Sequence, residues 1–166
     1  MPSKSLLTLY YALIYPYLTY CNLIWACTYV TNLQRIYLLQ KRAVWVISKA
    51  DYKASSKPLF ANLKILDVFS IFSLQVSSFI NLYHNDALPF AFTQIFQTGN
   101  HIHQYSTRYF DFYRPHNCRT NIKKFSILFH GPRIWNSLAN NIKNAPNFNI
   151  FKRVIKPFLR LRQDTT

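Results

Sequence analysis

Residues 31–49 constrain this chain more than any other stretch, because their side chains divide sharply into an apolar and a basic set. An α-helix advances about 100° per residue, and on that wheel the apolar set forms one broad arc that only Gln40 interrupts. The arc holds Leu33, Ile36, Tyr37, Leu39, Ala43, Val44, Val46 and Ile47. The pattern predicts a helix that packs this face on a hydrophobic core.

The opposite arc of the same segment is basic, and it has two interpretations. It holds Arg35, Lys41, Arg42, Trp45 and Lys49, with Leu38 among them. Cations around an aromatic ring suit a polyanion, with the cations on phosphates and the indole stacked on a base. A charged face is also the ordinary solvated side of a surface helix, and another part of the chain would then cover Trp45. The wheel alone favours the solvated face.

The charge of the whole chain is strongly one-sided. Its 166 residues include 20 Lys and Arg against 5 acidic residues, all Asp, for a formal net charge of +15. Residues 108–162 hold twelve of these cations and a single acid, Asp111. Such a surface needs a polyanionic partner, either nucleic acid or an anionic membrane.

Composition also indicates where such a chain works. With 50% hydrophobic residues, it is apolar enough and long enough to form a real core. Its three cysteines include no CxxC pair, which favours reduced thiols over a disulfide framework. The first residues lack the features of a signal peptide. We therefore expect an intracellular protein, in the nucleus or cytoplasm.

Catalytic chemistry finds little support in the sequence. Polymerases and nucleases hold divalent metals with clustered carboxylates, and here no two acidic residues lie closer than sixteen positions. Four metal-ligand side chains are spaced too loosely for a recognised zinc pattern. They are His101, His103, His116 and Cys118. We expect no catalytic residue, no metal site and no cofactor.

Residues 5–34 contain no charged side chain, which raises the question of a membrane span. A central Pro16, polar side chains and the five tyrosines of residues 10–20 disfavour one, because tyrosine prefers the membrane interface to the bilayer centre. We expect instead a buried helix, interrupted at Pro16 and ending near Cys27. With residues 31–49 it would form a helical hairpin.

Two further helices are predicted after the hairpin. Ser56 is placed to cap a short helix over residues 58–63, where a proline is tolerated in the first turn. Asp67 is placed to cap a longer helix over residues 68–83, whose apolar side chains keep helical spacing. Residues 1–88 are thus expected to form a mainly α domain, a helical hairpin plus a helical bundle.

Residues 89–166 form a second region, a basic and partly irregular C-terminal extension. Two short aromatic or β-branched runs, residues 109–113 and 125–129, are predicted as strands of a short β-hairpin. A turn is predicted at Gly131-Pro132.

The chain is expected to end in a helix over residues 150–161, with apolar side chains on one face and cations beside them. Asn149 is placed to cap this helix. Pro157 is expected to kink or shorten it, because proline offers no backbone N–H.

Cations and aromatic rings alternate at the start of the extension. The residues are Arg108, Tyr109, Tyr113, Arg114, His116, Arg119, Lys123 and Lys124. This pattern is typical of a groove in which cations meet phosphates and rings stack on bases. A solvated basic loop whose aromatic side chains pack inward fits equally well, so both interpretations stay open.

Several motifs, in order, resemble one known family. They are LYYALIYPYLTYCNLIW at residues 9–25, LLQKRA at 38–43, KPLF at 57–60, LKIL at 63–66, RTN at 119–121, GPRIWNSL at 131–138 and NIK at 141–143. The first four look like the region that follows the palm in non-LTR (LINE-type, jockey-like) retrotransposon reverse transcriptases, and the rest look like the C-terminal tail. One departure is Ala139, where the tail more often carries proline.

The resemblance implies a thumb-like region and tail without fingers or palm, because no Asp here matches the palm's catalytic motif. Such a fragment of an RNA-directed DNA polymerase would not be an enzyme on its own. It would hold RNA, DNA or an RNA–DNA duplex, and would pair with the missing fingers and palm. The expected contacts are Arg35, Lys41, Arg42, Trp45, Lys49, Arg119, Lys123 and Lys124.

Two other classes of protein remain as alternatives. One is a membrane-associated basic protein that inserts its N-terminal apolar helix and binds lipid headgroups through its cations. The other is a helical protein-interaction fragment that has no activity of its own.

Overall fold

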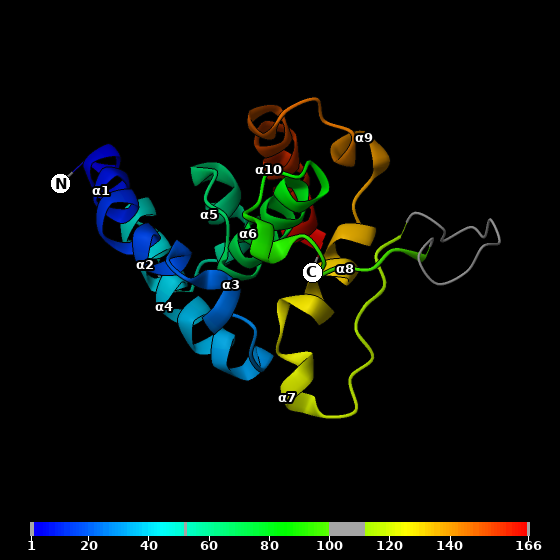
Figure 1. Cartoon of the computed structure of the whole chain (residues 1–166). Helices are drawn as coiled ribbons and strands as arrows, with labels where there is room; N and C mark the ends of the chain where they lie inside the picture. Colours follow the sequence, from blue (N-terminus) through cyan, green and yellow to red (C-terminus); the bar gives the residue numbers. More distant parts are fainter. Residues whose placement is uncertain (1, 52, 100–111, 166) are drawn as a thin grey trace. The chain divides into compact units, whose positions relative to one another are not determined.

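The computed structural model describes residues 2–51, 53–99 and 112–165. Over these residues the chain is mainly helical, which confirms the expected fold class (Figure 1). The elements are α1 (Ser3–Leu9), the π-helical turn η1 (Tyr10–Ile14), α2 (Tyr15–Thr19), α3 (Asn22–Trp25), α4 (Val30–Ser48), α5 (Ser56–Leu63), α6 (Val68–His84), the 3₁₀ turn η2 (Phe90–Phe92), α7 (Asn121–Lys124), α8 (Ile127–Asn136), α9 (Asn140–Lys143) and α10 (Phe148–Thr165). Thr98 and Tyr113 form an isolated antiparallel bridge.

The chain divides into two compact units. Unit 1 comprises Met1–Leu74 together with Lys156–Thr166, and unit 2 comprises Gln75–Ile155. Two helices contribute to both, since α6 begins in unit 1 and ends in unit 2, and α10 runs the other way. The boundary expected after residue 88 followed a change in composition, whereas these units follow packing and divide the chain elsewhere.

The N-terminal segment of unit 1 is helical from α1 through α2, and its irregularity precedes Pro16. In the π-helical turn η1, the N–H of Tyr15 reaches the carbonyl of Tyr10. A π turn widens a helix and rearranges its hydrogen bonds, so the helix accommodates a proline that has no N–H. The break comes later than predicted, at Cys21, whose φ of 49° is left-handed.

The same segment pairs with α4, as the predicted hairpin requires, because α1 packs against α4 (Figure 1). It is not buried on all sides, however. Tyr10 and Leu18 lie in the core, whereas Leu13, Tyr17 and Tyr20 are 61%, 81% and 77% exposed. The prediction of a buried helix is therefore wrong for one side of the segment.

Gln40 is the central polar residue of unit 1. It is only 2% exposed. Its Nε2 donates to the hydroxyl of Tyr10 and to the carbonyl of Leu66, each at 2.8 Å. Its Oε1 accepts the N–H of Val68, the first residue of α6, at 2.9 Å. One side chain of α4 thus joins η1, the Leu66 carbonyl and the start of α6, and it satisfies a helix-terminal donor that has no partner within the helix.

This position of Gln40 corrects the predicted core face of α4. The buried residues of the helix are Leu33, Gln40, Val44 and Ile47. Leu39 and Val46, which the wheel placed on the apolar arc, are 62% and 63% exposed. The polar residue that appeared to interrupt the arc lies at the middle of the buried face, so one edge of the arc is left in solvent.

The two predicted caps after α4 have different outcomes. Ser56 is the first residue of α5 and is buried, with Ser55 as the flanking residue, so Ser56 is not the cap. Asp67 caps α6 as predicted, because its Oδ1 accepts the N–H of Ser70 at 2.7 Å. Burial raises the pKa of the Asp67 carboxyl, and hydrogen bonds from Ser70 partly offset that shift.

Unit 2 is organised around an aromatic cluster. The ring centroids of Tyr83 and Phe96 lie 5.0 Å apart, and those of Phe96 and Tyr113 lie 5.7 Å apart. Two hydrogen bonds fix the loops to helices: the Tyr83 hydroxyl donates to the carbonyl of Phe96 at 3.0 Å, and Asn136 Nδ2 donates to the carbonyl of Tyr113 at 2.7 Å. Trp135 of α8 is also buried.

Helix α8 overturns two predictions, since residues 127–129 are helical rather than part of a strand, and Gly131-Pro132 lies inside the helix. Pro132 offers no N–H to the carbonyl of Leu128, but that carbonyl instead accepts the N–H of His116 at 3.3 Å. A Cβ on Gly131 would lie 3.0 Å from Cδ1 of Ile80, so the glycine permits close packing rather than a turn. Residues 109–111 lie outside the described part of the chain.

The final helix, α10, is longer than predicted. Its cap is Asn147 rather than Asn149, because Asn147 Oδ1 accepts the N–H of Ile150 at 2.9 Å. The helix passes through Pro157, so the predicted shortening is wrong. Arg153 and Pro157 are both exposed, so water can satisfy the Arg153 carbonyl that the proline leaves without its helical donor.

Candidate nucleic-acid interface

Three predicted phosphate contacts form a row along α4, which we call the α4 row: Arg35, Arg42 and Lys49. Arg35 and Arg42 are exposed within the helix, and Lys49 follows it as an exposed C-cap with a left-handed φ of 51°. Arg35 and Arg42 share one helical face about 10 Å apart, and Lys49 follows at the same seven-residue spacing at the end of the helix. The first acid in the sequence is Asp51, so the fifty residues before it contribute no negative charge.

The other two α4 residues of the predicted site are half-buried and make contacts within unit 1. Lys41 Nζ lies 4.6 Å from the centroid of the Tyr37 ring, a cation–π distance. Trp45 Nε1 donates a hydrogen bond to the carbonyl of Ala54 at 3.1 Å. An indole has a single N–H, so a role of Trp45 in binding bases would depend on its ring alone.

The remaining predicted contacts lie in unit 2, around α7. Arg119 precedes the helix, and Lys123 and Lys124 lie in its last turn, all three exposed. Lys124 Nζ donates to Oδ1 of Asn121 at 3.4 Å, and Ile122 beside it is 82% exposed. The predicted site is therefore distributed over both compact units, with five residues on α4 and three around α7.

The aromatic side chains of the extension do not follow the pattern of a stacking groove. Tyr113 is only 6% exposed, and its hydroxyl lies 3.0 Å from Nδ1 of His84. Burial raises the pKa of Tyr113 to about 12. Arg114, by contrast, is exposed. Tyr113 therefore packs inward, as the alternative interpretation required, and the predicted partners Arg108 and Tyr109 lie outside the described residues.

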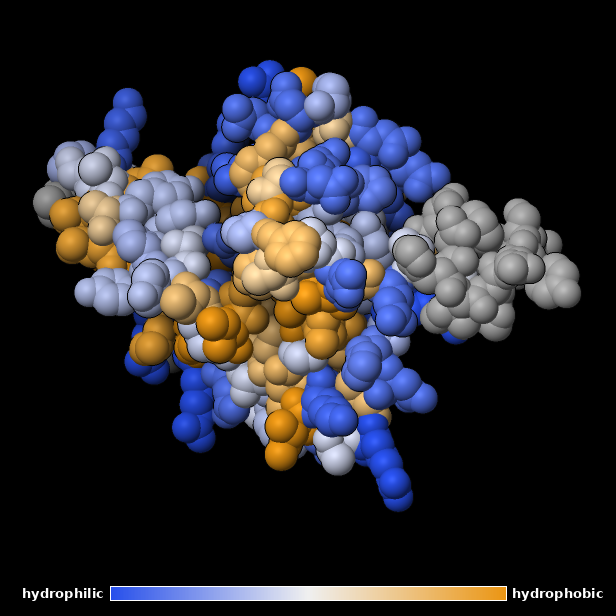
Figure 2. Space-filling view, in the orientation of Figure 1, coloured by the Kyte–Doolittle hydropathy of each residue, from blue (hydrophilic) through white to orange (hydrophobic). Residues whose placement is uncertain are grey.

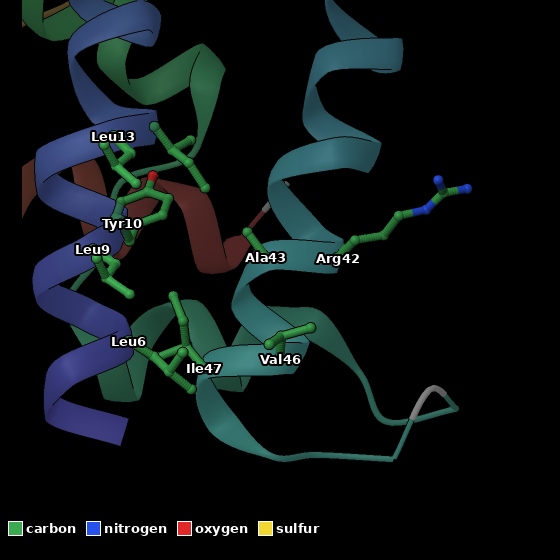
Figure 3. A pocket seen from close by; sticks show the side chains of 9 residues that line it. Leu6, Leu9, Tyr10, Leu13, Arg42, Ala43, Val46 and Ile47 are labelled. Carbon is green, nitrogen blue, oxygen red and sulfur yellow. The ribbon is translucent and has the colours of Figure 1, made fainter. Parts of the chain in front are cut away.

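Unit 1 also contains an apolar groove that the sequence did not reveal, about 320 Å³ in volume, between the N-terminal helix and α4 (Figure 3). Its lining residues are Leu6, Leu9, Tyr10, Leu13, Ile14, Arg42, Ala43, Val46 and Ile47. Figure 2 shows hydrophobic side chains at the surface of the region that α1–α4 occupy. One lining residue, Val46, belongs to the apolar arc of residues 31–49 from which the sequence predicts a core contact.

The described residues were also searched for a metal site and for a membrane-spanning helix. Among them, no group of three His, Cys or acidic side chains could hold a metal ion. His101 and His103 lie outside this set. Over the same residues no single helix is long and apolar enough to cross a membrane, although α5 and α6 together, as a bent pair, have the length and composition.

Three comparisons with known proteins complete this description of the site. No protein-family model, curated protein or solved structure matches this chain. The geometry and charge of the α4 row and the α7 cations therefore carry the functional inference.

Proposed function

We propose that this chain binds the phosphate backbone of nucleic acid along the α4 row, as the non-catalytic, template-primer-holding part of an RNA-directed DNA polymerase. The observation that supports it best is the regular spacing of three exposed cations along α4 and its C-cap. Double-stranded DNA carries one negative charge per roughly 1.7 Å of axis, so a row of cations about 20 Å long has several phosphates within reach. The polymerase assignment rests on the sequence motifs alone.

The composition of unit 1 supports a backbone contact rather than the reading of a sequence. Each α4-row side chain is a long cation on the surface, suited to phosphate oxygens rather than to a fixed pattern of base edges. The net charge of the whole chain, +15, adds a long-range attraction for the same ligand. Binding should therefore depend strongly on salt and weakly on base sequence.

The test measures the affinity of the full chain for an RNA–DNA duplex by fluorescence anisotropy at low salt. The test variant is Arg35→Gln, Arg42→Gln and Lys49→Gln combined. Its control combines Lys53→Gln, Lys57→Gln and Lys64→Gln, three exposed cations of the same unit. The two variants are matched in charge, and each replaces one left-handed C-cap, since Lys64 has φ 56° after α5.

We expect the α4 variant to bind about tenfold more weakly and the control to stay near wild type, because only the first loses direct phosphate contacts. Equal losses of affinity in both variants would mean that the α4 row acts only through the overall positive charge of the chain. That result would contradict the proposed interface. Measurable primer extension by the chain alone would contradict its non-catalytic role.

A further inference from the structure

The groove between the N-terminal helix and α4 has a buried apolar floor and exposed apolar rims. Its floor consists of Tyr10 and Ile47, which are 1% and 3% exposed and belong to the core cluster of unit 1. Its rims are open, because Leu9, Leu13 and Val46 are 41%, 61% and 63% exposed. A ligand could therefore bury the exposed apolar rims of the groove while the core beneath it stays closed.

One rim of the groove is cationic. Arg42 lines the α4 wall with its aliphatic stem, and its guanidinium points away from the N-terminal helix (Figure 3). The other cations of the α4 row, Arg35 and Lys49, lie beyond the lining residues, about 10 Å along α4 from Arg42 in either direction. An occupant that matched this rim would carry acidic groups beside its apolar ones.

We propose that this groove binds an amphipathic helix of a partner protein, which inserts leucine-like side chains between α1 and α4 and directs acidic side chains to the α4 row. Recognition of a helix by a hydrophobic groove places anchors at i, i+3, i+4 and i+7 of that helix. The lining residues extend over a little more than two helical turns on one wall, Leu6 to Ile14, and over about one and a half on the other, Arg42 to Ile47, enough for two or three such anchors.

The shape of the surface favours a helix over a lipid bilayer. Residues that insert into a membrane interface project from a convex face, as on an amphipathic helix that lies in the headgroup layer. Here Leu9 and Leu13 on one wall lie across a concavity from Val46 on the other, so a flat lipid surface would contact the rims and leave the space between them unfilled.

Charge favours an acidic partner over a second copy of the chain. The first fifty residues contain five cations and no acid, so two copies of this surface would bring like charges together. A helix with glutamates at the edge of its apolar stripe would instead neutralise Arg35, Arg42 and Lys49 as it docks. These cations are also the proposed nucleic-acid contacts, but the groove itself does not depend on that function.

The probe is a synthetic peptide of about 18 residues, with leucines at i, i+4, i+7 and i+11 and glutamates beside them. A peptide of the same composition in shuffled order removes the stripe, and a lysine-for-glutamate version reverses the charge. Binding of each peptide to the full chain is measured by fluorescence anisotropy. We expect affinity for the acidic amphipathic peptide alone.

Neutral substitutions at the rims test the location of the site. Leu13→Gln with Val46→Gln should weaken binding of the peptide by about tenfold, since both remove exposed anchors of the groove. Ile24→Gln is the matched control, because Ile24 is 77% exposed in the same segment and does not line the groove. For the charge, Arg42→Glu should weaken binding, while Lys57→Glu on α5 should not.

Several results would overturn the proposal. If the shuffled peptide bound equally well, the groove would be a nonspecific apolar surface. If the rim variants bound the peptide as tightly as wild type, the peptide would bind elsewhere on the chain. Binding to phosphatidylglycerol-containing vesicles without binding to the peptide would assign the surface to membranes. Dimerisation in sedimentation experiments that the Leu13→Gln and Val46→Gln pair abolishes would assign it to a second copy.

Discussion

The two compact units of this chain maintain their cores by different means. In unit 1 a polar side chain, Gln40, lies at the centre and uses both its nitrogen and its oxygen in hydrogen bonds. In unit 2 an aromatic cluster around Tyr113 dominates, and a helix packs so closely that a methyl group on Gly131 would crowd Ile80 and Phe96. Unit 1 should therefore be most sensitive to the loss of a polar partner, and unit 2 to added volume.

Buried polar atoms without a hydrogen-bond partner occur in both units. Among the described residues of unit 2 they include both polar atoms of the Asn81 side chain and the hydroxyl of Ser77. In unit 1 they include Oδ1 of Asn22 and Nε of Arg160. The units therefore differ in the residues at the centre of their cores rather than in whether buried polar groups are left unpaired.

The largest effect is expected from Gln40→Leu. The substitution leaves the Val68 N–H and the Leu66 carbonyl buried without their partner, which should lower the free energy of unfolding by about 3 kcal/mol. Urea unfolding followed by circular dichroism measures it. Gln34→Leu, at an exposed position of the same helix, is the control. If Gln40→Leu lowered the free energy of unfolding no more than Gln34→Leu does, the hydrogen bonds of Gln40 would not be what stabilises unit 1.

Gly131→Ala tests unit 2 in the same assay. The added Cβ would lie 3.0 Å from Cδ1 of Ile80 and 3.2 Å from the Phe96 ring, so we expect a loss of about 2 kcal/mol. Ile80→Val removes the nearest of these atoms. The double variant should therefore lose less than the sum of the two single variants. A strictly additive double variant would show that close packing at Gly131 is not the cause.

Asp67 offers a smaller test, on the cap of α6. Asp67→Ala should cost about 1 kcal/mol, while Asp67→Asn keeps the side-chain acceptor and should cost little. Because burial raises the pKa of the folded carboxyl, the folded state holds its proton more tightly than the unfolded chain. Wild type should therefore gain stability relative to Asp67→Asn as the pH falls through that raised pKa, and lose it as the pH rises. Unfolding free energies measured across the acidic range would contradict this if the difference were constant.

The smallest effect is expected from Trp45→Phe. The ring is kept, but the hydrogen bond to the Ala54 carbonyl is lost, which should cost about 0.5 kcal/mol of unfolding free energy. Affinity for an RNA–DNA duplex should stay within about twofold of wild type, because stacking needs only a ring. A large fall in affinity without a change in stability would mean that the indole N–H itself contacts the ligand.

Local patterns in the sequence predicted the elements of unit 1 well. The expected helix over residues 31–49 is α4, and the cap at Asp67 is present, since both depend on residues within one or two turns. The role of Gln40 could not be predicted, because its partners lie 26 to 30 residues away. Likewise the proline of α8 is tolerated only because a distant N–H, from His116, takes its place.

The candidate site, too, could be predicted from the sequence only in part. The wheel predicted that Arg35, Arg42 and Lys49 share an exposed face, because exposure of charged side chains follows from helical geometry. It could not predict the groove beside them, whose second wall comes from residues 6–14. Nor could it predict that Tyr113 turns inward, which depends on its contact with His84.

The most direct test of the proposed interface is the salt dependence of binding to the RNA–DNA duplex. Plotted as the logarithm of affinity against the logarithm of salt concentration, the slope reports the number of phosphates neutralised. The α4 variant, with Arg35, Arg42 and Lys49 all changed to Gln, should reduce the slope by about 2 to 3, roughly one for each cation. Its charge-matched control at Lys53, Lys57 and Lys64 should leave the slope nearly unchanged. Equal reductions in both variants, or a wild-type affinity that does not vary with salt, would contradict the account.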